Sequence, residues 1–162
     1  MLVVNAELTS VTLLRNNLDT ESATMLATIA KEKGISLCGI APGQTEANFC
    51  ALGLGSVDAI LVASDLFVRA ELTECNLRNN NLGVEGWTII FNALRDTPTS
   101  KIAKWDLSHE KLGPKIAKPL AEYLSVTASL TALDVRINRL GNEGEALLQQ
   151  AVQGRSGFDL KM

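Results

Sequence analysis

A spaced pattern, Leu-x-x-Leu-x-Leu-x-x-Asn-x-Leu, recurs along this chain and limits its possible folds more than any other feature. We call it the frame and number its positions 1 to 11. Its five copies begin at residues 8, 44, 72, 102 and 130, so the last three intervals are 28, 30 and 28 residues. A period of this size predicts a solenoid, in which each repeat is one supersecondary unit stacked on the next.

Three copies of the frame are clear and two are degenerate. The clear copies are Leu8-Val11-Leu13-Asn16-Leu18, Leu72-Cys75-Leu77-Asn80-Leu82 and Leu130-Leu133-Val135-Asn138-Leu140. The degenerate copies are Gln44-Ala47-Phe49-Leu52-Leu54 and Ile102-Trp105-Leu107-Glu110-Leu112. We expect the apolar positions 1, 4 and 6 to face inward from a short strand. The amides of Asn16, Asn80 and Asn138 at position 9 are expected to form a ladder that bonds to buried main chain. Leu52 and Glu110 should interrupt that ladder.

A second pattern follows each frame. Gly55, Gly83, Gly113 and Gly141 come directly after position 11, as expected for a tight turn into a helix. Apolar residues then recur at the spacing of one helix face. These stripes are Ala23/Leu26/Ala27/Ala30, Ala59/Val62/Ala63/Leu66, Trp87/Ile90/Phe91/Leu94 and Ala117/Leu120/Ala121/Leu124. Each repeat is therefore predicted to be a strand, a turn and a helix, with parallel strands and all helices on one side.

The two ends and one insertion depart from the period. The fifth stripe is polar at Glu145 and Gln149, which fits a C-terminal cap over 145–162 that ends in a truncated strand at Phe158-Asp159-Leu160. Met1-Leu2-Val3-Val4 has the pattern of a helix tail that leads into the first copy. Residues 34–43 are an insertion and are expected to form an extra strand or a protruding loop. Pro119 should lie near the first turn of a late-starting helix, or kink it.

The segments LTECNLRNNNLGVEGWTIIFNAL and LTALDVRINRLGNEGEALLQQAV most clearly resemble the ribonuclease-inhibitor class of leucine-rich repeats. The resemblance covers nearly the whole chain, apart from residues 1–7 and the insertion. It implies a single α/β domain over 1–162, a right-handed solenoid arc with parallel strands on its concave face and helices on its convex face. It also implies a protein that grips other proteins with the strand face. Members of the class include inhibitors, immune sensors, actin-binding proteins and Ran GTPase-activating proteins.

Composition argues against several other classes of function. The net charge is −3 with no evident Lys/Arg cluster, so we expect no nucleic-acid partner. The longest apolar stretch, Ala59 to Val68, is interrupted by Asp65 and is too short to span a bilayer. Cys38, Cys50 and Cys75 lack the spacing of a metal site. We therefore predict free thiols, a cytoplasmic location, no metal and no cofactor.

We predict no catalytic residues. His109 is the single histidine, and Ser108 is only its sequence neighbour, so the two side chains should point in opposite directions. Trp87, Phe91 and Trp105 are expected to fill the core rather than to bind an aromatic ligand.

Residues at the outward frame positions are the candidate partner-binding residues. Acidic and basic groups alternate there, which suits local complementarity to a protein partner. The set is Glu46, Asn48, Glu74, Asn76, Arg78, Lys104, Asp106, Asp134 and Arg136. The primary hypothesis is a non-catalytic protein-interaction module. One alternative is a structural subunit that docks in a larger assembly through its uncapped N-terminal repeat. The other, from class analogy alone, is a GTPase-activating protein of the Ran type.

Overall fold

The computed structural model describes residues 8–162, and the helix tail predicted at Met1–Val4 lies outside them. Within this part, five parallel strands form one sheet in chain order. The strands are β1 (Glu46–Asn48), β2 (Glu74–Asn76), β3 (Lys104–Asp106), β4 (Ala132–Asp134) and β5 (Asp159–Lys161). The helices are α1 (Thr20–Lys33), α2 (Asp58–Val68), α3 (Gly83–Arg95), α4 (Ala117–Val126) and α5 (Gly141–Ala151), with a 3-10 turn η1 (Pro114–Ile116) before α4.

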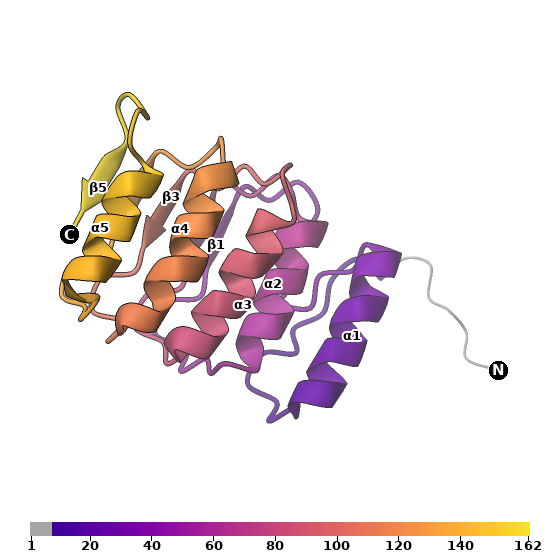
Figure 1. Cartoon of the computed structure of the whole chain (residues 1–162). Coiled ribbons are helices and arrows are strands. Elements are labelled where there is room, and N and C mark those ends of the chain that lie inside the picture. Colours follow the sequence, from indigo (N-terminus) through magenta and orange to yellow (C-terminus); the bar gives the residue numbers. More distant parts are fainter. Residues whose placement is uncertain (1–7) are drawn as a thin grey trace.

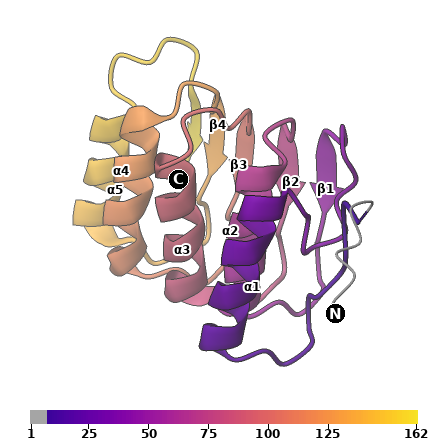
Figure 2. The same ribbon diagram turned by 90° about the vertical axis from the view of Figure 1, so that its right-hand side faces the viewer.

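The helices form one layer and the strands form the other, so one face of the sheet is covered and the other is open (Figures 1 and 2). Successive helices pack side by side, as do successive strands. The architecture is thus a repeat-like α/β arrangement, compatible with a solenoid. Frame positions align between neighbours, because Lys104 pairs with Ala132, Trp105 with Leu133 and Asp106 with Asp134. Each frame position therefore forms a row across the sheet.

The core lies between the two layers. Position 4 supplies one inward side chain per strand, and all four of these are buried: Ala47, Cys75, Trp105 and Leu133. From the other side, the stripes of α2 and α3 are buried completely and those of α1 and α4 in large part, whereas only Leu148 of the α5 stripe is buried. The aromatic residues of the third and fourth copies form one cluster, in which Phe91 stacks on Trp87 at 5.5 Å and on Tyr123 at 5.6 Å between ring centroids. Trp87, Phe91 and Trp105 are thus core residues.

A backbone feature repeats with the frame. Position 8 has a left-handed conformation in every copy, with φ between 57° and 62°, although its residue type varies. These residues are Arg15, Ala51, Asn79, His109 and Ile137. Among the four glycines after position 11, only Gly83 and Gly141 have positive φ. The loop after the strand therefore reverses direction in the same way each time, independently of the side chain.

The helix of the fourth copy begins late, as predicted. The chain passes through η1 first, and α4 then begins at Ala117, so that Pro119 lies in its first turn. At this position the missing N–H of proline leaves no helical hydrogen bond unmade. At the C-terminal end, the predicted truncated strand is present as β5, which pairs with β4.

The first copy differs from the others. It forms no strand of the sheet, and its residues Ser10 and Thr12 instead make isolated bridges to Ser36 and Cys38 of the insertion. Residues 34–43 thus match neither alternative fully: they form isolated bridges but no strand of the sheet, and only residues 41–43 form an exposed loop. Ser36, Leu37, Cys38 and Ile40 are all buried.

Two charged side chains of the second copy hold this insertion in place. The buried carboxylate of Asp65 on α2 accepts hydrogen bonds from the Ser36 hydroxyl and from the backbone N–H groups of Leu37 and Cys38. Arg69, just after α2, donates to the carbonyls of Ile40, Gly34 and Thr9. The insertion is thus bound both to the first copy and to the end of α2.

Candidate functional site

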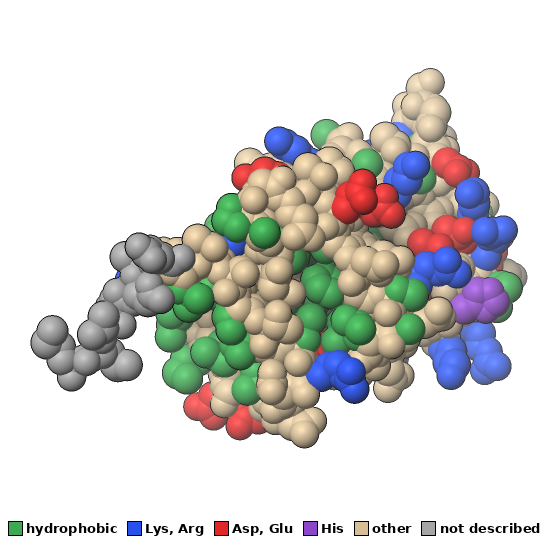
Figure 3. Space-filling view, turned by 180° about the vertical axis from the view of Figure 1, so that it is seen from behind, with side chains coloured by type: hydrophobic (Ala, Val, Ile, Leu, Met, Phe, Trp, Pro, Cys, Tyr) green, Lys and Arg blue, Asp and Glu red, His purple; other side chains and the backbone are tan. Residues whose placement is uncertain are grey.

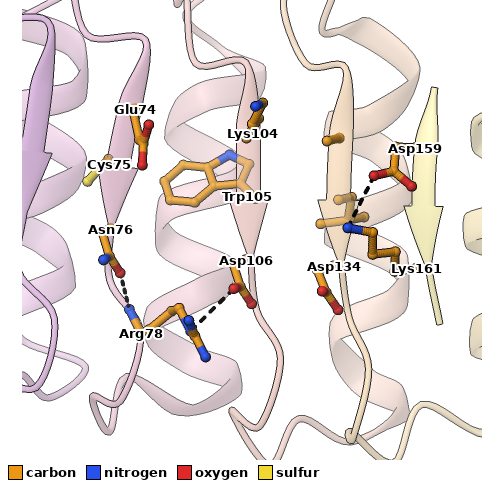
Figure 4. A pocket seen from close by; sticks show the side chains of 12 residues that line it. Glu74, Cys75, Asn76, Arg78, Lys104, Trp105, Asp106, Asp134, Asp159 and Lys161 are labelled. Atoms are coloured by element: carbon orange, nitrogen blue, oxygen red, sulfur yellow. Dashed lines mark hydrogen bonds and ion pairs between the residues drawn. The ribbon is translucent and has the colours of Figure 1, made fainter. Parts of the chain in front are cut away.

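The open face of the sheet carries a shallow hollow of about 280 Å³ over β2 to β5 (Figure 4). Its lining is contributed by four successive strands and the residues just after them. Six of the nine candidate partner-binding residues lie together there: Glu74, Asn76, Arg78, Lys104, Asp106 and Asp134. Glu46 and Asn48 lie on β1, outside this hollow. Arg136 lines an adjoining hollow of about 260 Å³ together with Arg78 and Asp106.

Ion pairs organise the charges of this face. Arg78 Nε lies 3.2 Å from the Asp106 carboxylate, which joins the second and third strands (Figure 4). Arg136 binds Asp134 through both Nε and a terminal nitrogen. This contact holds the pKa of Asp134 below its ordinary value and raises the pKa of the Arg136 guanidinium. Lys161 and Asp159 on β5 form a third pair at 3.3 Å.

Other charges of the face have no such partner. Glu46 and Glu74 are direct neighbours in the β1–β2 register, and Glu74 is in turn the neighbour of Lys104. None of the three is in an ion pair within 4.0 Å among residues 8–162. Their charges are therefore free to meet an incoming group.

The position 5 residues of strands β1 to β4 also stabilise the turn that follows each strand. Each side chain there accepts a hydrogen bond from the backbone N–H two residues later, which closes a turn at the end of the strand. The four bonds are Cys50 to Asn48, Arg78 to Asn76, Ser108 to Asp106 and Arg136 to Asp134, all between 3.0 and 3.1 Å. The turn therefore uses the single side-chain oxygen of Asn48 and Asn76. It uses one carboxylate oxygen of Asp106 and Asp134, whose other oxygen is paired with Arg78 or Arg136.

Asp159 and Lys161 line the hollow but are not among the residues proposed from the sequence. They belong to β5, which follows the last copy of the frame and lies outside all five copies. The available signal was the truncated strand Phe158-Asp159-Leu160. Adding β5 in register with β4 places Asp159 beside Ala132 and Lys161 beside Asp134.

Two of the three position 9 asparagines link neighbouring copies. Asn80 donates to the carbonyls of Phe49 and Leu77 and accepts from the N–H of Leu54. Asn138 likewise donates to the carbonyls of Leu107 and Val135 and accepts from the N–H of Leu112.

The other position 9 residues behave differently. Asn16 is exposed, and its amide reaches only the Leu14 carbonyl at 3.4 Å. Asn80 and Asn138 each bond to the preceding copy, and no copy precedes that of Asn16 among the described residues, so Asn16 does not bridge two copies. Glu110, which replaces asparagine, accepts from the N–H of Asn79 and the indole of Trp87. Burial raises the pKa of the Glu110 carboxyl, and these two bonds offset part of the rise.

Among the described residues, the cysteines and Ser108 make no hydrogen bond to His109. Cys38 and Cys75 are buried free thiols, and burial raises the pKa of Cys75 to about 12. The Ser108 hydroxyl donates to Asp106 at 2.6 Å rather than to His109. Residues 8–162 also bring together no group of three His, Cys, Asp or Glu side chains with the geometry of a metal site. Within that range, the helices are too short or too polar to cross a membrane.

Fold and site together define an α/β protein with a repeat-like architecture and a charged, hollowed sheet face. No protein-family model matches the chain, and no curated protein matches it.

Proposed function

We propose that this chain is a leucine-rich-repeat solenoid that acts as a non-catalytic protein-interaction module, with the open face of its sheet as the binding surface. The observation that carries the proposal is the hollow of about 280 Å³ whose lining comes from four neighbouring strands. Rows of outward side chains on parallel strands present a regular grid, and the exposed side chains of these rows can vary without disturbing the core.

The charges of the hollow favour a protein partner. Acidic and basic groups are interspersed, so the hollow offers local complementarity rather than bulk attraction to one sign of charge. The Arg78–Asp106 pair is well exposed, so it contributes little to stability and exchanges partners at low cost. Glu74 and Lys104 add one charge of each sign next to it.

The test is capture of partners from native extract by the immobilised chain, followed by mass spectrometry. The variant Arg78→Gln/Arg136→Gln should fold normally but lose most of the captured partner. The matched control is Lys101→Gln/Lys118→Gln, which removes the same charge at exposed positions that line neither hollow of the open face. Equal capture by the two variants would show that the partner does not bind at the open face.

A second candidate function is that of a structural subunit docked through its N-terminal end. Its support is apolar exposure on α1, where Met25 is 59% and Ile29 is 47% exposed, together with Leu8 at 45%. Exposed apolar side chains in proximity mark association surfaces. Sedimentation of the purified chain separates the candidates: concentration-dependent assembly that Met25→Lys/Ile29→Lys abolishes supports docking, and a monomer at all concentrations opposes it.

A further inference from the structure

The loops that follow β3 and β4 form a second surface beside the open face. Two of its residues, His109 and Ile137, also line the adjoining hollow of about 260 Å³. His109 and Lys111 come from the first loop, and Ile137 and Arg139 come from the second. These four residues, which we call the basic edge, line a hollow of about 410 Å³. All four side chains are exposed, and Ile137 is 69% exposed. None of them lines the hollow over β2 to β5.

The backbone fixes the basic edge in advance of any ligand. The His109 N–H donates to the Arg136 carbonyl at 3.2 Å, and the Arg139 N–H donates to the Leu112 carbonyl at 2.8 Å. The side-chain amide of Asn138 also donates to the Leu107 carbonyl and accepts from the Leu112 N–H of the loop after β3. Two loops joined in this way lose little conformational freedom when they bind, which favours affinity.

The charge of the basic edge is positive although the whole chain has a net charge of −3. Among the described residues, Lys111 and Arg139 have no ion-pair partner within 4.0 Å. Glu110 lies between His109 and Lys111 in sequence, but it is buried and bonded to Asn79 and Trp87. Figure 3 shows Lys and Arg side chains gathered around the histidine at one end of the molecule.

We propose that the basic edge docks an acidic segment of a protein partner that carries an apolar side chain. Carboxylates of the segment pair with Lys111 and Arg139, and its apolar side chain packs on Ile137. A nucleic acid fits less well, because binding along a phosphate backbone needs a longer track of cations and gains nothing from an exposed isoleucine. Lys111 and Arg139 line neither hollow of the open face, so substituting them tests the basic edge separately from the site that contains Arg78 and Arg136.

The experiment uses two synthetic peptides, a run of glutamates around a central leucine and the same run around a central serine. His109 is the only histidine of the chain, so its ring signals in NMR spectra are a unique reporter at the basic edge. We expect saturable shifts of these signals with the leucine peptide and weaker binding of the serine peptide. The affinity should also fall as salt is raised, because exposed charge pairs are screened.

Variants then locate the binding. Lys111→Asn/Arg139→Gln should weaken binding of the leucine peptide about fivefold or more, since two exposed charge pairs are lost. Asn suits the left-handed backbone at position 111, where φ is 57°. The control Lys101→Gln/Lys118→Gln, with the same loss of charge, should bind within about twofold of the unsubstituted chain. Ile137→Asn should weaken the leucine peptide and leave the serine peptide unchanged. Circular dichroism and a thermal melt establish that each variant is folded.

Three outcomes would overturn the proposal. The first is the absence of a saturable shift at His109 at millimolar peptide. The second is equal weakening by the control variant, which would indicate long-range attraction instead of docking. The third is tighter binding of a single-stranded oligonucleotide than of either peptide, which would make nucleic acid the ligand.

Discussion

At the scale of single residues, the repeated left-handed conformation at position 8 is the clearest sign that the copies share one backbone path. Asn79 and His109 are of residue types enriched in this conformation, whereas Ala51 and the β-branched Ile137 are not. The sequence therefore contains no local signal that all five copies share. The conformation is imposed by the strand on one side and by the next turn on the other, so tertiary structure overrides local preference.

We predict that Ala51→Gly stabilises the protein by about 0.5–1 kcal/mol. A left-handed L-residue costs about 1–2 kcal/mol, and the greater freedom of glycine in the unfolded chain offsets part of the gain. The matched control is Ala146→Gly on the exposed face of α5, which should destabilise by about 0.5–1 kcal/mol. Urea denaturation measures both. A change of the same sign in the two variants would contradict the conformational argument.

At the scale of elements, the sequence predicts the regular parts and misses the irregular one. Strands β1 to β4 lie within the frame copies, and β5 overlaps the predicted truncated strand but begins and ends one residue later. The frame succeeds because alternation and period directly encode which side chains face inward. The insertion at 34–43 could not be placed, since no periodic pattern covers it. Its partners were nevertheless visible as two charged residues, Asp65 and Arg69, in an otherwise apolar helical stretch.

The same distinction holds for the candidate site. Six proposed residues share one hollow because the frame fixes both their strand and their side of the sheet. Asp159 and Lys161 were missed because the last strand has no frame. The basic edge was missed because its cations are separated in sequence, and only the stacking of two loops brings Lys111 and Arg139 together.

We predict a pH-dependent contribution to stability from Asp65. Burial raises the pKa of its carboxyl above the ordinary value of 3.8, and bonds from Ser36, Leu37 and Cys38 offset part of the rise. Since the folded protein holds this proton more tightly than the unfolded chain, the contribution is fully present below pH 3.8 and is lost as the pH rises through the folded-state pKa. The stability of the unsubstituted chain relative to Asp65→Asn should therefore decrease over that range.

Paired urea titrations of the two proteins at a series of pH values measure this difference. Subtraction removes the contributions of all other groups that titrate in the same range. A difference that stays constant, or that grows as the pH rises, would show that Asp65 does not carry a raised pKa.

At the scale of the whole molecule, the repeats are stacked in chain order, and each helix packs mainly on the helices before and after it in sequence. In such arrays stability is a sum of local terms, so damage at one end need not reach the other. The two ends are held by similar devices. Arg69 bonds to carbonyls of the first copy and the insertion, and Arg155 bonds to the carbonyls of Leu124 and Leu130.

We predict that Arg69→Met lowers hydrogen-exchange protection over residues 8–40 and leaves β3 to β5 protected. The substitution removes three hydrogen bonds to carbonyls of that region, and local opening becomes easier. Among the described residues, the Thr9 carbonyl alone of the three keeps a second donor, the Ser36 N–H. The mirror control, Arg155→Met, should lower protection near β5 and leave α1 unchanged. Exchange measured by mass spectrometry resolves the two regions. Uniform loss along the chain in both variants would show instead that the molecule opens as a single unit.

The aromatic cluster has a practical consequence for anyone who studies this protein in solution. Both of its tryptophans, Trp87 and Trp105, lie 5.7 Å apart between ring centroids in the middle of the array. Intrinsic fluorescence therefore reports on the centre alone. Local unfolding at either end would not change the tryptophan fluorescence. A melting curve recorded from this signal would therefore give the stability of the central repeats and not that of the whole protein.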